Sequence, residues 1–585
     1  MTYTGTPGGV EQASSDGGRE LVMLAVPGVQ SFIESSRTTA DLYAASQIRV
    51  AIMRSAVGSA EGASGAVLVF PPTTREASSN RLVVDVPAGM GQSVGTAAAE
   101  AAAETWRKRV GGGPLDRSED LAVVWVVSAG DDEKSRYTNA QRALSDRRRL
   151  RDFAGRNGAN PLGLCHMCGE HPASWTPAAL EKQFLGEGER LCRVCLTKRW
   201  HKHAHPQEGF PSTSAISSGP YRRAVLSQMT KPAVAAAVDE LVKAVKRLGP
   251  DLPRPASNAI PGLSSNSAAG TALLSIDGQW CYPESWQTNA LNRELKITGG
   301  EELAKHGADA ARSLQRACGD GHLTPYYAIV ALDADQLGRR LGDLGSFERQ
   351  IQTAQLMSAA AVTQQGVVEH ADQLGRLVFA GGDDVLALLP ATTALRAASL
   401  AAAGTTQELR TTLPDVTVSG AIAYVHRTYP FGPALRLARE ALKSAKDAGR
   451  NRLAVVVVRR GGERARSILP WTESGREPVG DLVRVASAFQ TRQMSEGVLR
   501  TLTIEAAGLA AVGARVPSRV QSELRRLVDR HIDSNIRDDE RIALVADLSG
   551  AMYGLMRAGS VGGRAQVDLL VEALTVARFI AKEAQ

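Results

Sequence analysis

The first run of alternating apolar and polar segments begins at Leu21. A short apolar strand, LVMLAVP, precedes DLYAASQIRVAIMRSAV, whose apolar residues at three- and four-residue spacing predict a helix. The segments AVLVF and RLVVDV then predict two strands, an Ala-rich stretch over 93–110 predicts a second helix, and LAVVWVVS predicts a fourth strand. The order β-α-β-β-α-β predicts a ferredoxin-like domain over 21–135.

The same order of elements recurs from Tyr326. The strand YYAIVALDAD is followed by a long helix over 347–370 and by RLVFAGGDDVLALLP, which predicts a hairpin. A helix over 393–410 and the strand VTVSGAIAYV complete the second copy, and one more helix and one more strand, RLAVVVVRR, follow it. We therefore predict a second ferredoxin-like core within 321–465.

The remaining segments differ from these two cores in pattern. Residues 1–20 are predicted to be a disordered tail, and 136–320 a region with paired cysteines, helices and a Pro/Ser/Gly-rich linker over 249–270. Helical periodicity with charged faces predicts an all-helical C-terminal domain over 466–585, whose expected role is packing and partner docking. The predicted fold class is α+β and multidomain.

Composition adds a basic bias to this picture. The chain of 585 residues has a net charge of +7, and its basic residues gather in DRRRLR (146–151) and KRWHKH (198–203). Such runs favour nucleic acid as a partner, or they are only solvated surface. No apolar run approaches the roughly 18 residues of a membrane span, and the N-terminus lacks a signal-peptide pattern, so a cytoplasmic protein with no membrane partner is expected.

The predicted hairpin carries two adjacent acids at its tip. Asp383 and Asp384 follow Gly381 and Gly382, and Gly-Asp tips are often no more than solvated turns. In a β-α-β-β-α-β sheet, however, the first strand lies beside the third, which brings Asp333 close to Asp383. Carboxylates on neighbouring strands suit Mg²⁺ or Mn²⁺, and a two-metal site could activate a ribose hydroxyl and steady a triphosphate.

Four cysteines form the spacing C-x2-C-x23-C-x2-C, namely Cys165, Cys168, Cys192 and Cys195. This pattern predicts a structural Zn²⁺ site with four thiolates, although His166 or His171 could replace one of them. A redox role is disfavoured because two pairs occur outside a βαβ context.

Three motifs together resemble the palm and nucleotide-cyclase superfamily: LDADQLG, FAGGDDVLALLP and AREALKSAKDAGRNRL. The resemblance implies that Asp333 and Asp383 hold the metals, that Asp384 assists in activating the hydroxyl, and that Lys446 contacts phosphates rather than being an ordinary solvated helix residue. The other nucleotide contacts that it implies are Gly381, Gly382, Asp335 and Ser419.

The first core lacks these motifs. Its inter-strand loop, PPTTREASSN, has no Gly-Gly-acid-acid sequence, and its first strand ends in VPGVQSFIESSR rather than in an Asp pair. It cannot bind the same metals, so it is expected to be a scaffold for the active copy or to hold a second nucleotide.

The series AVPGVQSFIESSRTTADLYAASQ, the two CxxC pairs, GFPSTSAISS, FAGGDDVLALLP and SGAIAYVHRTYP resembles the large palm-domain subunit of type III CRISPR effector complexes, most like the III-B branch. The resemblance implies guide RNA, target RNA and other type III subunits as partners, and RNA-activated condensation of ATP into cyclic oligoadenylates. Many members begin with a histidine-aspartate nuclease domain. This chain has no His-Asp dipeptide and no room for that domain before Leu21, so no DNase activity is expected.

Two alternatives remain open from the sequence. The chain could be a non-catalytic scaffold that binds guide RNA, target RNA and neighbouring subunits. It could also be a palm enzyme that makes a different adenylate product.

Overall fold

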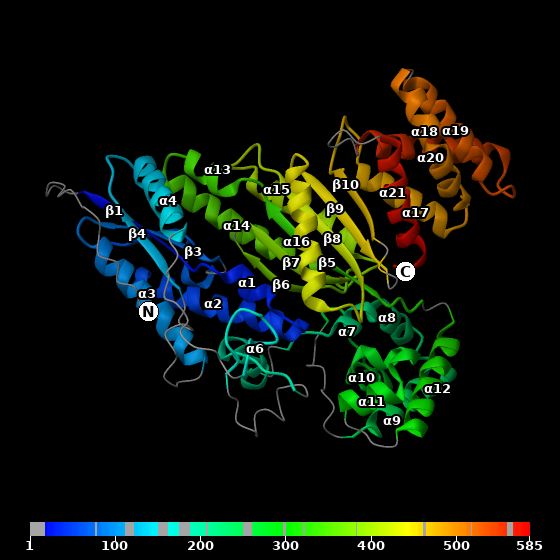
Figure 1. The fold of residues 1–585 in the computed structure, drawn as a ribbon, viewed down its shortest axis with the longest axis horizontal. Helices are drawn as coiled ribbons and strands as arrows, with labels where there is room; N and C mark the ends of the chain where they lie inside the picture. The colour runs from blue at the N-terminus through cyan, green and yellow to red at the C-terminus, as the bar shows by residue number, and fades with distance from the viewer. Residues whose placement is uncertain are drawn as a thin grey trace.

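The computed structural model places most of the chain around two β-sheets that lie side by side (Figure 1). The described residues are 18–76, 79–110, 122–149, 162–174, 188–205, 209–249, 260–295, 300–319, 322–381, 383–459, 462, 464–515, 517–558 and 566–584. Of the predicted tail, residues 1–17 lie outside this set, as do residues 250–259 of the predicted linker.

The first sheet belongs to what we call the first palm. Its strands are β1 (Arg19–Ala25), β2 (Val67–Phe70), β3 (Arg81–Pro87) and β4 (Val124–Ser128). They are antiparallel in the order β2-β3-β1-β4, so the first and third strands are central neighbours, as predicted. Its helices are α1 (Val29–Glu34), α2 (Thr39–Glu61), α3 (Gly91–Val110) and α4 (Glu133–Arg149), with a short 3₁₀ turn, η1 (Thr74–Glu76), after β2.

The second sheet belongs to the second palm and has the order β10-β9-β8-β5-β7-β6. Its strands are β5 (Tyr326–Ala334), β6 (Arg376–Gly381), β7 (Asp384–Pro390), β8 (Val418–His426), β9 (Arg452–Val458) and β10 (Arg464–Pro470). Its helices are α13 (Leu337–Asp343), α14 (Phe347–Val368), α15 (Ala394–Leu409) and α16 (Phe431–Asp447). Four of the strands repeat the order of the first sheet, and β9 and β10 extend it.

Two predicted domain boundaries fall inside elements of the palms. The boundary at 135 cuts α4, whose Tyr137 and Leu144 pack against the first sheet. The boundary at 465 cuts β10, which pairs along its whole length with β9. Both elements therefore belong to the palms. Each packs against or pairs with strands from elsewhere in the chain, so the local sequence pattern does not reveal the contact.

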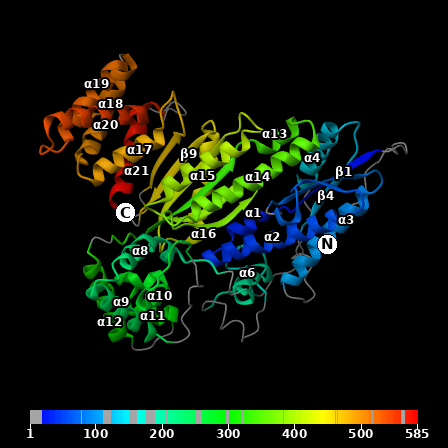
Figure 2. The same ribbon diagram turned by 180° about the vertical axis from the view of Figure 1, so that it is seen from behind.

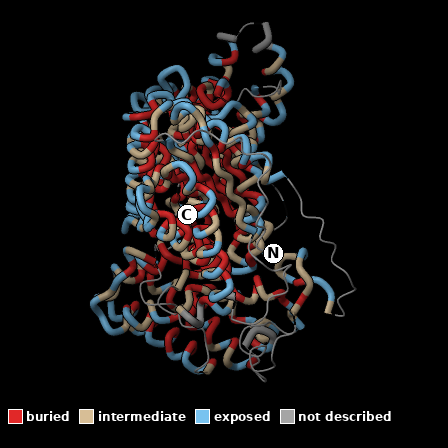
Figure 3. Tube along the Cα trace, turned by 90° about the vertical axis from the view of Figure 1, so that its left-hand side faces the viewer, coloured by how far each residue is buried: buried red, intermediate tan, exposed pale blue. Residues whose placement is uncertain are grey.

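Strand β5 is apolar from Tyr326 to Leu332 because it is buried on both faces. Its residues Ala328, Val330 and Leu332 join the core under α15, whereas Tyr327 and Ile329 join the core under α16. A strand buried on both faces needs no polar positions. Figure 3 shows this as a continuous buried interior with exposed residues outside it.

The two palms pack reciprocally. Helix α2 of the first palm lies against β6 of the second, and the corresponding helix α14 of the second lies against β2 of the first. Helices α1 and α16 touch in the same way that α13 and α4 do. Figures 1 and 2 show α2 and α14 from opposite sides at this junction. The arrangement gives the pair of palms an approximate two-fold relation, which brings the ends of β1 and β5 to one interface.

A four-cysteine module and a helical unit occupy one side of the palms (Figure 1). The module contains α6 (Arg193–Ala204), which packs on α2. The helical unit comprises α7 (Thr213–Ser217), α8 (Gly219–Ser227), α9 (Pro232–Lys246), α10 (Ala268–Leu274), η4 (Gly278–Cys281), η5 (Pro283–Ser285), α11 (Thr288–Leu295) and α12 (Glu301–Cys318).

The C-terminal helices cover the far end of the second palm (Figure 1). They are α17 (Pro478–Gln490), α18 (Gly497–Arg515), α19 (Pro517–His531), α20 (Asp538–Ala558) and α21 (Gln566–Lys582). Their buried residues form one continuous core with the second sheet. Within the described part of the chain, no helix has the length and apolar character needed to cross a bilayer.

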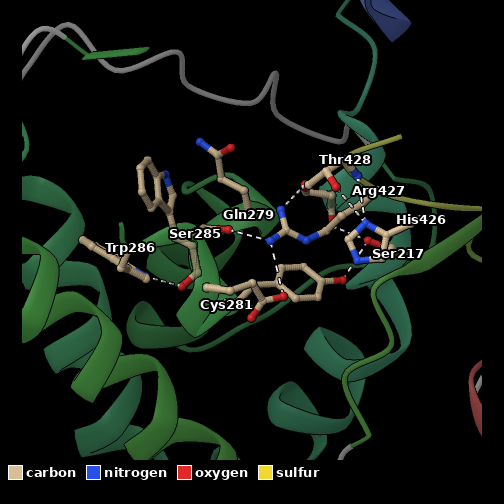
Figure 4. Close-up of polar contacts among 12 residues, drawn as sticks. Ser217, Gln279, Cys281, Ser285, Trp286, His426, Arg427 and Thr428 are labelled. Carbon is tan, nitrogen blue, oxygen red and sulfur yellow. Dashed lines mark hydrogen bonds and ion pairs between the residues drawn. The ribbon is translucent and has the colours of Figure 1, made fainter. Parts of the chain in front are cut away.

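Arg427, at the end of β8, fastens the helical unit to the second palm (Figure 4). Its guanidinium lies 4.1 Å from the centre of the Tyr282 ring and donates to Ser285 Oγ at 2.8 Å. The Tyr282 hydroxyl donates in turn to the Thr324 carbonyl at 2.8 Å and meets Ser217 Oγ at 2.7 Å. The Arg427 side chain is only 6% exposed, so these contacts act with little screening by water.

We expect Arg427→Ala to weaken this attachment. Loss of the ring contact and of the charge-assisted hydrogen bonds should lower the free energy of unfolding by about 3 kcal/mol. Thermal unfolding and limited proteolysis of the helical unit measure the effect. The matched control is Arg312→Ala on α12, where an exposed arginine pairs only with Asp309. Equal melting temperatures for the two variants would contradict the assignment.

Candidate functional site

The β5–β7 pairing places two carboxylates directly opposite each other. Asp333 on β5 is the register partner of Asp384 on β7. Directly opposed residues of an antiparallel pair point to the same face, and these two side chains come within hydrogen-bonding range. Gly381 is paired with Asp384 at the end of β6, so Asp383 lies in the turn between the two strands.

Asp383 lies in that turn, and its carbonyl oxygen accepts a hydrogen bond from the backbone N–H of Ala334 at 2.9 Å. The turn is thereby tied to the end of β5. Gly382, a predicted nucleotide contact, lies outside the described residues. Gly381, the other predicted glycine contact, is a buried strand residue.

The acids repel one another electrostatically. Desolvation and then the charge of Asp383 raise the pKa of Asp384 well above its usual value, and desolvation and then the charge of Asp333 raise the pKa of Asp383. Both residues keep solvent-accessible surface although protein surrounds them closely. The site therefore favours neutralisation of its acids, by protons or by a cation.

Lys446 supplies one neutralising charge. It lies near the end of α16, and its Nζ is 2.5 Å from Asp333 Oδ1. The turn that follows holds Gly449, Arg450 and Asn451 at φ values of 118°, 64° and 50°. Two non-glycine residues in the left-handed region are strained, and such strain is tolerated where the surroundings fix the backbone. The sequence prediction that Lys446 belongs to the site fits this geometry.

Asp335 holds the backbone of this strained turn in place. Its buried carboxylate accepts hydrogen bonds from Thr417 Oγ1 at 2.7 Å, Ser419 Oγ at 2.7 Å and the backbone N–H of Asn451 at 3.1 Å. It therefore joins the end of β5 to β8 and to the strained turn after α16.

This geometry corrects one prediction. Asp335 and Ser419 were expected to contact a nucleotide, but they are 2% and 0% exposed and bond to each other. A ligand cannot reach them without opening the sheet. They hold the backbone around the site instead, and sequence reasoning missed this because only their tertiary partners show that Asp335 turns into the fold after the end of β5.

The donor set fits a hard divalent cation. Asp333 and Asp384 present carboxylate oxygens on one face, and Asp383 lies near enough for charge effects between it and both of them. Oxygen ligands of this kind, with open positions for water and phosphate, are what Mg²⁺ and Mn²⁺ prefer. A merely solvated turn would not place two acids in direct register on adjacent central strands and raise their pKa values.

Two arginines of the first palm also surround the acids. Arg49 of α2 lies close enough to Asp384 and Asp383 to feel both charges, and Arg81 acts in the same way on Asp383. Sequence reasoning missed both residues, because it treated the first palm as a copy without chemistry. Comparison of the two hairpins strand by strand would have pointed to Arg81.

The predicted basic run 198–203 is partly structural. Lys198 is 1% exposed and donates from Nζ to the carbonyl oxygens of Phe32 and Ser35, at 2.8 Å for Ser35. Arg199 pairs with the buried Asp41 at 2.7 Å. These two cations hold α6 to α1 and α2 and do not face a partner, whereas Arg148 and Arg149 of the other run are exposed.

The structure brings the four predicted cysteines together. The Sγ atoms of Cys165, Cys168, Cys192 and Cys195 all lie within 4.8 Å of one another, and Cys168 and Cys192 are 3.9 Å apart. Tetrahedral zinc with Zn–S bonds near 2.3 Å requires sulfur separations of about 3.8 Å. Backbone N–H groups of Met167 and Cys195 point at Cys165 Sγ and Cys192 Sγ, each at 3.4 Å.

Neither nearby histidine replaces a thiolate. The ring of His166 accepts a hydrogen bond from the backbone of Arg190, and among the described residues the cluster contains cysteines alone. Against the effect of Cys165, which raises it, hydrogen bonds with Cys192 and Cys195 lower the pKa of Cys168 to about 6, and hydrogen bonds with the other three cysteines raise the pKa of Cys195. Four thiols this close cannot all ionise unless a cation joins them, so the chemistry fits a metal such as Zn²⁺.

We expect Asp384→Asn to raise the melting temperature in EDTA near pH 7.5. A carboxyl whose folded-state pKa is raised contributes stability at low pH and loses that contribution as the pH rises, so the amide relieves a cost present at neutral pH. The gain should shrink toward pH 4, where Asp384 is protonated.

Differential scanning fluorimetry across this pH range measures the effect, with the exposed Asp239→Asn as control. Mg²⁺ or Mn²⁺ should stabilise the wild type more than Asp384→Asn, because the variant lacks one of the charges that attract the cation. A variant that is less stable than the wild type at pH 7.5 in EDTA would contradict the charge repulsion.

Metal analysis should find about one equivalent of zinc in the purified protein. Replacement of Cys165 and Cys192 by Ser should remove that zinc and lower the melting temperature, because α6 begins at this cluster. The buried cysteines Cys281 and Cys318 lie outside the cluster, so their Ser variants are the control. A zinc-free wild type would refute the assignment.

Comparison with known proteins matches both palms. Residues 326–454 match the family model described as Cas10/Cmr2, second palm domain, and residues 21–111 match the one described as CRISPR-associated protein Cmr2, N-terminal. The CRISPR system Cmr subunit Cmr2 of Pyrococcus furiosus is 25% identical over 345 residues, which cover 52% of this chain and 36% of that relative. The match thus spans about a third of the relative's length.

Solved structures share the fold. A chain of the type III-B Cmr-beta complex bound to cognate target RNA superposes with a TM-score of 0.67 at 13% identity, covering 97% of this chain and 83% of that one. Its apo state gives 0.60 at 13% identity, covering 97% and 82%. The two family models, one at each palm, therefore make this chain similar to the Cas10/Cmr2 proteins over residues 21–111 and 326–454.

Proposed function

We propose that the chain is the large subunit of a type III CRISPR effector complex and that its second palm condenses ATP into cyclic oligoadenylates. The observation that carries the proposal is the register pair Asp333–Asp384 with Asp383 beside it, inside the segment that matches the second palm domain. Guide RNA paired with a target RNA would switch the reaction on in the cytoplasm. The fold shared with a Cmr-beta chain supports the III-B branch.

The reaction joins nucleotides and releases pyrophosphate. A ribose 3′-oxygen forms a bond to the α-phosphorus of ATP, the bond to the bridging oxygen breaks, and the hydroxyl proton passes to a base. Asp384 is suited to take this proton, because its raised pKa makes it a stronger base than an ordinary carboxylate. Bound Mg²⁺ or Mn²⁺, held by Asp333 and Asp383, supplies Lewis-acid stabilisation of the oxygens.

Lys446 and the sheet beneath complete the proposed site. The Lys446 ammonium can leave Asp333 for a phosphate oxygen, since both are anions at the same end of β5. Asp335 holds the turn after α16 in place while this happens. Rigid positioning of this kind is the main protein contribution to phosphoryl and nucleotidyl transfer.

One observation favours the non-catalytic alternative. The Lys446–Asp333 ion pair at 2.5 Å occupies an acid that a metal would need. A scaffold subunit that binds RNA and its neighbours could keep this pair permanently closed. Activation by target RNA requires instead that the pair opens, so the two functions differ in whether nucleotide and metal displace Lys446.

The test is product formation by the assembled complex with ATP, Mg²⁺ or Mn²⁺ and cognate target RNA, read by mass spectrometry. We expect cyclic oligoadenylates from the wild type and at least a hundredfold less from Asp383→Ala/Asp384→Ala, since removal of metal-binding and charge-stabilising groups costs at least that much. Asp239→Ala is the matched control on an exposed helix. Equal nucleotide pools from wild type and double variant would refute catalysis, and a linear product would keep the enzyme but change its product.

A further inference from the structure

Strand β4 is an open edge of the first sheet. Within the described ranges, the other three sheet edges have a helix against them: α14 lies on β2, α2 lies on β6 and α21 lies on β10. Strand β4 packs against β1 on one side and against α3 and α4 on its two faces. No described strand pairs with its other side, so the outer backbone groups of β4 are available to another strand.

The sequence of β4 has none of the features that usually protect an edge strand. The segment VWVVS contains no charge and no proline, its pairing with β1 has no bulge, and its four apolar residues are all partly exposed. Natural edge strands commonly carry such features, because free backbone groups pair readily with other strands. The equivalent strand of the second palm, β8, has this edge paired with β9. The edge of β4 is therefore suited to strand pairing.

The two ends of β4 carry opposite charge. Asp131 and Asp132 follow the strand and are exposed, whereas α4 ends in the exposed Arg148 and Arg149. Helix α4 follows β4 after a short turn and packs back along it, so these arginines return toward the beginning of the strand. A unit with one acidic end and one basic end is complementary to an identical unit that runs antiparallel to it.

A two-fold axis at the middle of β4 produces this antiparallel arrangement. Directly opposed residues of an antiparallel pair share a face of the sheet. With Val126 at the axis, Val126 meets its own copy on the α4 face, and Trp125 meets Val127 of the other copy on the α3 face. These apolar pairs would extend the two cores that already enclose the strand.

We propose that the free chain forms a symmetric dimer through β4, which joins the two four-stranded sheets into one continuous sheet. The acidic turn after β4 in each copy then lies near the basic end of α4 in the other. Strand β2, which lies against α14 of the second palm, is the opposite edge of the same sheet. The dimer therefore leaves the junction of β2 and α14 untouched, and the inference does not depend on the reaction proposed for the second palm.

Sedimentation velocity of the full chain tests the dimer. A short strand pair is smaller than a standard interface, so we expect a monomer–dimer equilibrium in the range of about 1–100 µM that weakens as salt is raised. Val126→Lys should raise the dissociation constant about tenfold or more, because a lysine on an edge strand opposes pairing. Val67→Lys is the matched control, since Val67 lies on the other edge strand of the sheet and is 45% exposed.

Charge reversal tests the orientation of the two copies. Arg149→Glu and Asp131→Lys should each weaken the dimer about threefold to tenfold, since each removes an attraction and adds a repulsion. The double variant should recover affinity, because its charges attract again with their signs exchanged. Asp131 is chosen because Asp132 caps α4 through the backbone N–H of Ser135. A role in the stability of the monomer alone would lower the melting temperature of each variant without this recovery.

Hydrogen exchange keeps the test independent of the variants. The wild-type amides of β4 should exchange more slowly at high than at low protein concentration. A monomer at every concentration would overturn the inference, as would a dimer that Val126→Lys leaves intact or that Val67→Lys disrupts equally. Protection of β4 that is independent of concentration and arises only after other proteins of the complex are added would assign the edge to a partner's strand and overturn the dimer.

Discussion

The register of β5 against β7 is the constraint on which the candidate site depends. A shift of one residue would turn Asp333 or Asp384 to the opposite face, because side chains alternate along a strand. Side chains on both faces of β5 interdigitate with two separate cores, and this close packing holds the strand in its register. The large apolar core of the second palm therefore does more than stabilise the domain: it holds two mutually repelling carboxylates at a fixed position.

Repulsion of this kind destabilises the unliganded fold, and the surrounding residues limit the effect. Lys446 compensates Asp333 directly, whereas Asp335 keeps the strained turn after α16 from relaxing. Asp333, near the end of β5, keeps 15% of its side chain exposed, whereas Asp335, just past the end of the strand, is buried and bonds to Ser419 of β8.

The sequence predicted the four repeated strands and the two longest helices of each palm to within a few residues, since each of them carries its own periodicity. It also predicted the cysteine cluster, because ligand spacing is a local property. It could not predict which polar residues turn inward. Asp335, Ser419 and Lys198 look like surface or ligand-binding residues in the chain, and only their tertiary partners show that they are internal. Strand β10 was missed because its pairing with β9, and not an apolar pattern of its own, makes this segment a strand.

The same distinction applies to the first palm. Judged by its own motifs it is a degenerate copy, since Ala25 and Arg81 replace an acid pair. Judged by its position it contributes charge, because the reciprocal packing of α2 and α14 brings its strand ends to the acids of its neighbour. Loss of the acids from one copy removes the repulsion that two facing acid clusters would create across the interface. A cation there converts that repulsion into attraction, so the asymmetry between the copies stabilises the paired arrangement.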